Sequence, residues 1–201
     1  AVKWKGTSTT VVEGLRMVRL IILARLLVPE DFGLMAMVTV VIGFAEIFSD
    51  GGISSAIIYR QDSSRNQLAS LYWLNIFAGI TVFMLVWATL PLVVQFYGEP
   101  RLADLMAWTS LVFLIAPIGQ QFRILLQKEL EFKRLAQVAV LAAVTGTVVA
   151  VWSALSGQGV FSLVWGQLAT VTTRSLLLAR LGWKKAWVPS FHFSTSDLKG
   201  Y

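Results

Sequence analysis

The sequence predicts an all-α membrane protein, a bundle of about six transmembrane helices. Of its 201 residues, 56% are hydrophobic and only 14% are charged, against roughly 25% charged residues in ordinary soluble domains. The apolar residues are also gathered into long runs, and about 20 consecutive apolar residues are enough to cross the hydrocarbon of a bilayer. A water-soluble fold of this size could not cover so much apolar surface, so the helices are expected to face lipid.

The apolar runs follow one another with short charged or Gly/Pro-containing breaks. The first, 7–28, ends at Pro29-Glu30-Asp31, where a proline and two carboxylates oppose further burial. The second is expected over 32–58. The third, 68–97, is longer than a bilayer requires and is expected to tilt or project. The remaining three segments are expected over 104–127, 135–155 and 160–181.

Basic residues are distributed unequally between the two ends of this predicted bundle. With the N-terminus in the cytoplasm, the basic residues of the cytoplasmic segments are Lys3, Lys5, Arg60, Arg65, Lys128, Lys133, Arg134, Arg180, Lys184, Lys185 and Lys199. The outer loops hold Arg101 as their single basic residue. An excess of this kind in short loops sets orientation. It predicts cytoplasmic N- and C-termini, and it explains the basic net charge without a nucleic-acid partner.

Several kinds of chemistry are missing from the sequence. There is no cysteine and only one histidine, His192, so disulfides, thiolate chemistry and a metal cluster are not expected. No Gly-rich phosphate loop with a following Lys-Ser/Thr occurs. We therefore expect no cofactor, no metal and no catalytic site. Residues 1–185 are expected to form one six-helix lobe, and 186–201 a cytoplasmic juxtamembrane segment.

Ionisable residues inside the predicted spans are the candidate functional residues. Each costs at least about 2.5–3.5 kcal/mol at the bilayer centre and must face protein or water. Glu13, Arg16 and Arg19 follow at steps of three, which places them on one face of the first span. Glu46 and Asp50 are four apart on one face of the second span. An antiparallel pairing of these spans would bring Glu46 close to the depth of Arg16.

Later spans add further polar groups. Arg123 lies in the fourth span after Pro117, which favours a kink, and Gln167, Thr170 and Arg174 share one face of the sixth. In one interpretation, Arg16 or Arg19 simply forms a buried ion pair with Glu46. In the other, surplus arginines line a wet cavity for an anionic substrate, and phosphate is the anion that arginine recognises best. The predicted cavity residues are Arg16, Arg19, Arg123, Gln167 and Arg174. The residues predicted to pair with them, or to carry a proton or cation, are Glu13, Glu46 and Asp50.

Several stretches of the sequence are similar to one known family. They are Ile-Leu-Ala-Arg-Leu-Leu-Val-Pro-Glu-Asp-Phe-Gly-Leu at 22–34, Ile-Gly-Phe-Ala-Glu at 42–46, Ser-Asp-Gly-Gly-Ile-Ser-Ser-Ala at 49–56, Tyr-Trp-Leu-Asn at 72–75 and Leu-Glu-Phe-Lys-Arg-Leu-Ala at 130–136. In order and spacing they resemble polysaccharide flippases. These are the exporters of lipid-linked O-antigen or colanic-acid repeat units in the multidrug/oligosaccharidyl-lipid/polysaccharide exporter superfamily.

The resemblance implies a transporter rather than an enzyme. Members are expected to have 12 to 14 spans in two lobes around a cationic cavity, so this chain resembles an N-terminal lobe and is expected to be part of a longer protein. A dimer of single lobes is the alternative. The implied activity is flipping of undecaprenyl-pyrophosphate-linked oligosaccharide across the bacterial inner membrane, for lipopolysaccharide or exopolysaccharide synthesis. The implied partners are the bilayer, this lipid-linked substrate, the second lobe and other polysaccharide-assembly proteins.

Three other functions are alternatives to this one. A drug or organic-cation exporter of the same superfamily is disfavoured by the surplus of arginine in the spans. A membrane-bound enzyme of polysaccharide assembly usually relies on a large outer loop, whereas the outer loops predicted here are a few residues long. The third alternative is a membrane scaffold without transport activity, which a flipping assay would distinguish from a flippase.

Overall fold

The structure is a computed structural model that describes residues 2–50 and 65–184. These residues form α-helices joined by short turns, with no strand among them. The helices are α1 (Val2–Leu26), α2 (Pro29–Asp50), α4 (Arg65–Tyr97), α5 (Arg101–Ser110), α6 (Val112–Lys128), α7 (Phe132–Leu155) and α8 (Phe161–Lys184). The predicted all-α class is therefore confirmed. The last part of the second predicted span, 51–58, lies outside the described residues.

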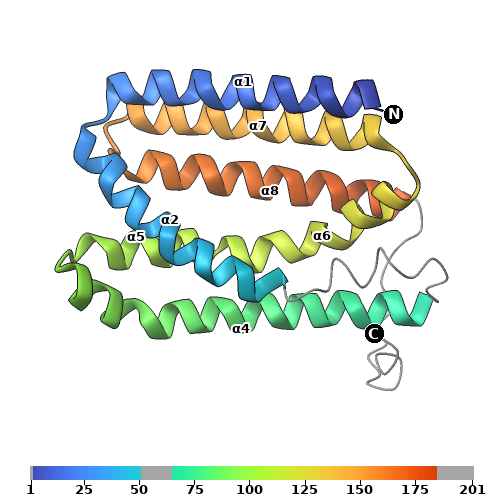
Figure 1. Ribbon diagram of the computed structural model, residues 1–201, viewed down its shortest axis with the longest axis horizontal. Helices are drawn as coiled ribbons and strands as arrows, with labels where there is room; N and C mark the ends of the chain where they lie inside the picture. Colours follow the sequence, from blue (N-terminus) through green and yellow to red (C-terminus); the bar gives the residue numbers. More distant parts are fainter. Residues whose placement is uncertain (1, 51–64, 185–201) are drawn as a thin grey trace.

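The helices run alternately up and down, with α5 and α6 forming one rod (Figure 1). The rod is interrupted at Leu111, whose backbone N–H donates to the Trp108 carbonyl in a tighter turn. Pro117 lies inside α6, six residues beyond this break, and it cannot donate to the Phe113 carbonyl. Gly79 of α4 lies against that carbonyl, and a Cβ at Gly79 would be only 2.3 Å from the Phe113 oxygen.

Three rods in the described part of the chain are long and apolar enough to cross a membrane. They are 29, 28 and 24 residues long, and cover Ala69–Tyr97, Arg101–Lys128 and Phe132–Leu155. The protein is therefore a membrane helical bundle. Of the other long helices, α1 and α8 carry several ionisable and polar side chains, and α2 carries Glu30, Asp31 and Glu46. That these three also span the bilayer stays a prediction.

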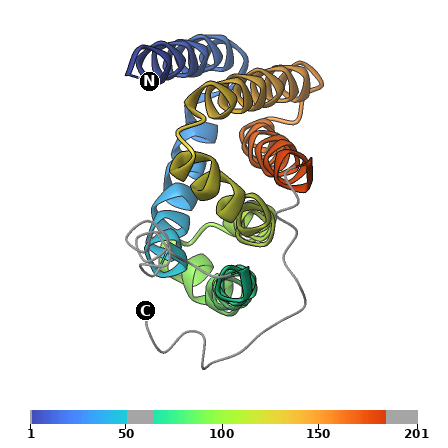
Figure 2. The ribbon, with the colours of Figure 1, turned by 90° about the vertical axis from the view of Figure 1, so that its right-hand side faces the viewer.

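The helices pack in a row, with one helix lying across it. α1 packs on α7, α7 on α8, α8 on α6, and α4 on both α5 and α6. Viewed from the end, α2 passes along one side of this row (Figure 2). It makes its main contacts with α5 and α4, and not with α1. The expected antiparallel pairing of the first two helices is thus replaced by packing of α1 on α7 and of α2 on α5 and α4.

The main core lies where α2 meets α5. Leu34, Val38 and Ile42 follow at steps of four and are buried on one face of α2. They share a cluster with Leu105 and Met106 of α5, both fully buried. Large apolar side chains on other faces of the bundle stay exposed, as expected for helices that face lipid rather than water.

α7 and α8 approach closely because small residues face each other. A Cβ at Gly146 of α7 would lie 1.8 Å from the Thr170 hydroxyl oxygen and 2.7 Å from the Gly166 carbonyl oxygen. Between membrane helices, such close backbone approach supplies much of the packing energy. It fixes α8, which carries part of the candidate site.

One end of the bundle holds a cluster of three charged residues. Arg101, at the start of α5, donates to Glu99 from Nε at 2.9 Å and to Glu30 of α2 from a terminal guanidinium nitrogen. The interaction joins the first turn of α2 to the turn between α4 and α5. Both turns were predicted to lie in outer loops, and they do lie at the same end of the bundle (Figure 1).

Replacing Arg101 by Gln is expected to lower the melting temperature slightly at neutral pH and not at acidic pH. The hydrogen bond from the Arg101 side chain holds the pKa of Glu99 below its ordinary value of 4.5. A carboxylate with a lowered pKa stabilises the folded state above the unfolded pKa, and the stabilisation is lost as the pH falls through the folded pKa. Since the pair is exposed, the effect is small.

Melting temperatures of the wild type and of Arg101→Gln at pH 7 and pH 3 measure this effect. Arg180→Gln, at an exposed arginine near the end of α8, controls for the loss of one positive charge. An equal difference in melting temperature between the wild type and Arg101→Gln at both pH values would show that the carboxylates do not contribute to the stabilisation by Arg101.

Candidate anion-binding cavity

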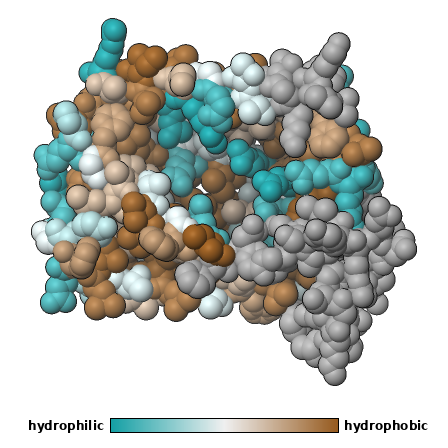
Figure 3. All heavy atoms as spheres, viewed as in Figure 1, coloured by the Kyte–Doolittle hydropathy of each residue, from teal (hydrophilic) through white to brown (hydrophobic). Residues whose placement is uncertain are grey.

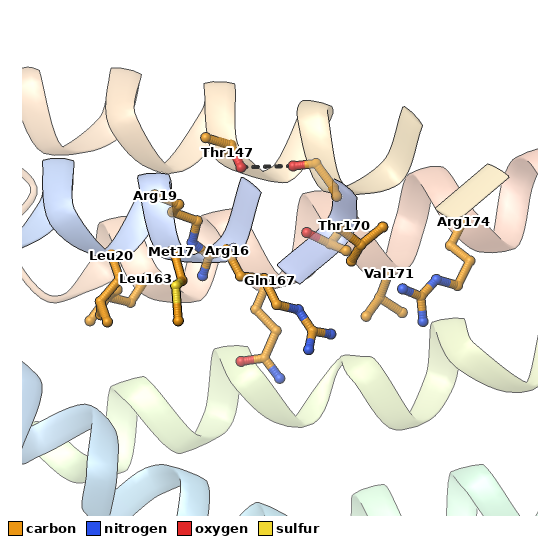
Figure 4. A pocket seen from close by; sticks show the side chains of 12 residues that line it. Arg16, Met17, Arg19, Leu20, Thr147, Leu163, Gln167, Thr170, Val171 and Arg174 are labelled. Atoms are coloured by element: carbon orange, nitrogen blue, oxygen red, sulfur yellow. Dashed lines mark hydrogen bonds between the residues drawn. The ribbon is translucent and has the colours of Figure 1, made fainter. Parts of the chain in front are cut away.

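A cavity of about 530 Å³ lies between α1, α7 and α8. α7 lines the cavity with the small residues Ala143 and Thr147, while α1 and α8 contribute arginine and glutamine side chains. Figure 4 shows the side chains of Arg16, Arg19, Gln167 and Arg174 extending from these two helices into one space. Four of the five predicted cavity residues therefore line the same cavity, here called the first cavity.

Helical spacing explains why these residues meet. Arg16 and Arg19 are three apart on α1, and Leu23 and Leu27 continue the same side of that helix toward its C-terminal end, where they are buried against Ala150 of α7 and Leu163 of α8. On α8, Gln167, Thr170 and Arg174 share one face, and Thr170 donates its hydroxyl to the Gly166 carbonyl at 2.8 Å. Two polar faces from different helices thus open onto one space.

Two further cavities adjoin the first through Arg174. The second, of about 320 Å³, is lined by Arg174 and Arg123 together with residues of α6 and α7. The third, of about 420 Å³, is lined by both arginines and by Glu46, Asn75 and Gln120. Figure 3 shows hydrophilic residues around a hollow in the middle of this face. Arg123, the fifth predicted cavity residue, therefore lines the second and third cavities but not the first, which Arg16 and Arg19 line.

The arginines outnumber their acidic partners. Arg16 pairs with Glu13 on its own helix at 2.9 Å. Among the described residues, Arg19, Arg123 and Arg174 have no carboxylate within ion-pair distance. The Arg174 charge lies near enough to Arg123 and Arg16 to be repelled by both. Among the described residues, the cavities thus concentrate positive charge, which a bound anion would balance.

Arg123 shows this lack of a partner at the level of one atom. Its Nε is buried and donates no hydrogen bond within the described part of the chain. A guanidinium presents five N–H donors in a rigid fork, and leaving a buried donor unpaired costs about 1–3 kcal/mol. An anion with several oxygens, such as a phosphate, satisfies such donors two at a time.

The acidic residues lie in different places. Glu13 pairs with Arg16 beside the first cavity. Glu46 lines the third cavity, and it does not pair with Arg16 because α1 packs on α7 while α2 packs on α5 and α4. Asp50 is the last residue of α2, and its side chain lies outside the described residues.

Sequence reasoning did not select Asn75 or Thr147, which line the third and first cavities. Asn75 is only 9% exposed in α4, and a single amide within a long apolar run is a usable signal for such a position. Thr147 donates its hydroxyl to the Ala143 carbonyl at 2.8 Å and resembles any helical threonine in the sequence. Nothing in its spacing distinguishes it.

Comparison with known proteins places these features in context. Residues 22–201 match the family described as polysaccharide biosynthesis protein. The chain is 36% identical over 196 residues to the lipopolysaccharide biosynthesis protein WzxC of Escherichia coli, covering 98% of this chain and 40% of that one. It is 31% identical over 199 residues to the teichuronic acid biosynthesis protein TuaB of Bacillus subtilis, covering 99% and 41%.

A third relative is named for transport. The chain is 28% identical over 193 residues to the succinoglycan biosynthesis transport protein ExoT of Rhizobium meliloti, covering 96% of this chain and 38% of that one. The chain therefore spans about two fifths of the length of these relatives. No solved structure shows a significant match.

Proposed function

This chain belongs to the polysaccharide biosynthesis protein family, and from that premise we propose that it is one lobe of a polysaccharide flippase. The intact protein moves undecaprenyl-pyrophosphate-linked oligosaccharide from the cytoplasmic to the outer leaflet of the bacterial inner membrane. The observation that carries this proposal is the set of joined cavities around four arginines, three of which, Arg19, Arg123 and Arg174, have no ion-pair partner among the described residues. The transport and biosynthesis names of the relatives support it.

A pyrophosphate is the part of such a substrate that fits the cavities best. It carries several oxygens that accept hydrogen bonds from guanidinium groups in pairs. Arg16, Arg19 and Arg174 reach the first cavity, while Arg123 reaches the second and third. Gln167 offers an amide to sugar hydroxyls or phosphate oxygens. Because the walls of the first cavity also include Met17, Leu20 and Leu163, the adjoining lipid carbons meet apolar side chains.

In the proposed cycle, a second lobe closes the other side of the cavities, and rocking of the lobes exposes the site to each leaflet in turn. In this proposal, residues 1–185 form one lobe of six helices with both ends in the cytoplasm, and 186–201 lead toward the second lobe. The second lobe comes from a longer chain or from a second copy. The rods pack as a continuous row, which suits movement of the lobe as one body.

Substitution of both Arg16 and Arg19 by alanine is expected to reduce flipping strongly at an unchanged protein level. The two side chains supply the positive charge of α1 in the first cavity, and each charged hydrogen bond lost from a phosphate costs about 1.5–3 kcal/mol. The measurement is export of the lipid-linked repeat unit by the intact protein in cells that lack their own copy, and flipping in proteoliposomes.

Arg25→Ala is the matched control, because Arg25 is an exposed arginine in the last turn of the same helix. Full export by the double variant at a normal protein level would refute the cavity assignment. Transport of a cationic dye in place of the lipid-linked repeat unit would support a drug exporter instead.

A further inference from the structure

The third cavity differs from the first two in the polar groups that line it. Arginines, amides and hydroxyls line the first and second cavities, and no carboxylate is among their described lining residues. The third cavity, of about 420 Å³, adds the Glu46 carboxylate of α2 and the Asn75 amide of α4. Its volume is within the range of about 300–1,000 Å³ that is usual for small-molecule sites. The third cavity thus combines acceptors and donors from four helices, α2, α4, α6 and α8.

Asn75 is a nearly buried amide that has no hydrogen-bond partner among the described residues. It is 9% exposed in a long apolar stretch of α4, and no hydrogen bond joins its side chain to another described residue. A side-chain amide offers two donor hydrogens and an acceptor oxygen. Burying such a group without partners is unfavourable, most of all in a membrane protein. We therefore expect its partners to lie in the third cavity.

The packing of α4 on α6 fixes the place of this amide. Gly79 lies four residues after Asn75, on the same face of α4. A Cβ at Gly79 would lie 2.3 Å from the Phe113 carbonyl oxygen and 2.8 Å from a ring carbon of Pro117, so the two backbones approach closely there. Phe113 and Pro117 also line the third cavity. Asn75 is thus held beside the apolar wall that α6 contributes, on helices that cannot shift without losing this contact.

Glu46 favours a sugar over a phosphate at this place. It is the single carboxylate that lines the third cavity among the described residues, and no described cation lies within ion-pair distance of it. A carboxylate only accepts hydrogen bonds, and a phosphate diester at neutral pH has no donor to offer it. A sugar hydroxyl both donates and accepts. It can donate to Glu46 while its oxygen accepts from the Asn75 amide or the Arg123 guanidinium.

We propose that the third cavity binds the sugar residue joined to the pyrophosphate, through hydrogen bonds between adjacent sugar hydroxyls and the side chains of Glu46 and Asn75. This inference rests on the proposed function and assigns one part of its substrate to a separate place. Arg174 lines all three cavities, so a pyrophosphate at its guanidinium lies next to the third cavity. The apolar side chains of α6 meet the C–H faces of the sugar ring. Asn75 and Glu46 therefore determine which first sugar is accepted.

Equilibrium binding to the purified intact protein in nanodiscs tests this assignment with two kinds of lipid of equal charge. The sugar lipids are a polyprenyl pyrophosphate that carries a single glucose, galactose or N-acetylglucosamine. The comparison lipid is the methyl diester of the same polyprenyl pyrophosphate, which keeps both phosphates and lacks the sugar. The wild type is expected to bind at least one sugar lipid roughly 10- to 100-fold more tightly than the methyl diester. Equal dissociation constants for the methyl diester and all three sugar lipids would overturn the proposal.

Two variants test the residues assigned to the sugar. Asn75→Leu replaces the amide by an apolar side chain of similar size and is expected to lower the preference for the sugar lipid about 2- to 12-fold. Glu46→Gln removes the charged acceptor and is expected to lower the preference roughly 10-fold. Neither variant should weaken binding of the methyl diester, because the pyrophosphate binds the arginines. If both variants weaken binding of both kinds of lipid by the same factor, the residues do not contact the sugar and the proposal fails.

Two controls match these variants. Gln95→Leu also replaces an amide of α4 by leucine, but at an exposed position that lines none of the three cavities. Asp104→Asn neutralises an exposed carboxylate at the start of α5. Both should keep the full preference for the sugar lipid. A control that loses as much of the preference as Asn75→Leu and Glu46→Gln would show that the preference does not arise in the third cavity.

Arg174→Gln separates this inference from the proposed function. Because both kinds of lipid carry the pyrophosphate, this variant should weaken binding of both by a similar factor. If the wild type binds both kinds of lipid equally and Arg174→Gln weakens both, the sugar assignment fails while the flippase proposal stands. If the wild type binds neither kind, the flippase proposal fails, and the sugar assignment fails with it.

Discussion

Replacement of Arg174 by Gln is expected to reduce flipping by the intact protein roughly 10- to 150-fold at subsaturating substrate. Arg174 is the residue shared by the first, second and third cavities. Its loss removes a charged hydrogen bond to phosphate wherever the anion lies, at a cost of about 1.5–3 kcal/mol. The measurement is the initial rate of flipping of a fluorescent lipid-linked oligosaccharide in proteoliposomes.

Two variants sharpen this test. Arg174→Lys keeps the charge but loses the planar fork that binds two oxygens at once, so an intermediate rate is expected. Arg180→Gln removes an exposed arginine six residues further along α8 and should leave the rate unchanged. A wild-type rate in Arg174→Gln would mean that the anion does not pass through these cavities.

Replacement of Gly146 by Leu is expected to prevent the accumulation of folded protein. A Cβ at this position would already overlap the Thr170 hydroxyl and approach the Gly166 carbonyl oxygen to 2.7 Å. Because the carbonyl belongs to the backbone, α7 and α8 would have to separate. Overpacking of this kind costs at least about 1–3 kcal/mol, and here the displaced element also carries Gln167 and Arg174.

The measurement is the yield of monodisperse protein by size-exclusion chromatography and its melting temperature. Gly33→Leu is the matched control, since no atom lies within 4 Å of a Cβ placed at this residue of α2. It should give a normal yield. Normal yield and melting temperature for Gly146→Leu would show that the tight approach of α7 and α8 is not required.

The helices could be predicted from the sequence, because apolar runs and their Gly/Pro breaks are local signals. The partners of α2 could not. The spacing of Leu34, Val38 and Ile42 indicates which face of α2 is buried, but not that α5 covers it. Chain order suggested α1 as the neighbour of α2, whereas the structure packs α2 on α5 and α4, and α1 on α7. The helical rod is also interrupted at Leu111, six residues before Pro117, where the sequence had suggested a kink.

The candidate site could be predicted in the same partial way. Charged and polar residues at helical spacing predicted a wet cavity lined by Arg16, Arg19, Arg123, Gln167 and Arg174. The structure brings all of them except Arg123 to the first cavity, and Arg123 to the second and third. Spacing alone could not tell that Glu46 lies beside Arg123 and Arg174 rather than Arg16. That depends on how α2 crosses the bundle, which is set by packing between residues far apart in sequence.

The position of Arg174 at the meeting point of three cavities has a consequence for the energy barrier of transport. If the proposed anionic substrate passes between the first and third cavities, it exchanges Arg16 and Arg19 for Arg123, while Arg174 lines both cavities. The anion then keeps at least one guanidinium partner during the passage, so it is not left unpaired in a medium of low dielectric constant. Several shallow wells in series allow faster passage than one deep well of the same total affinity.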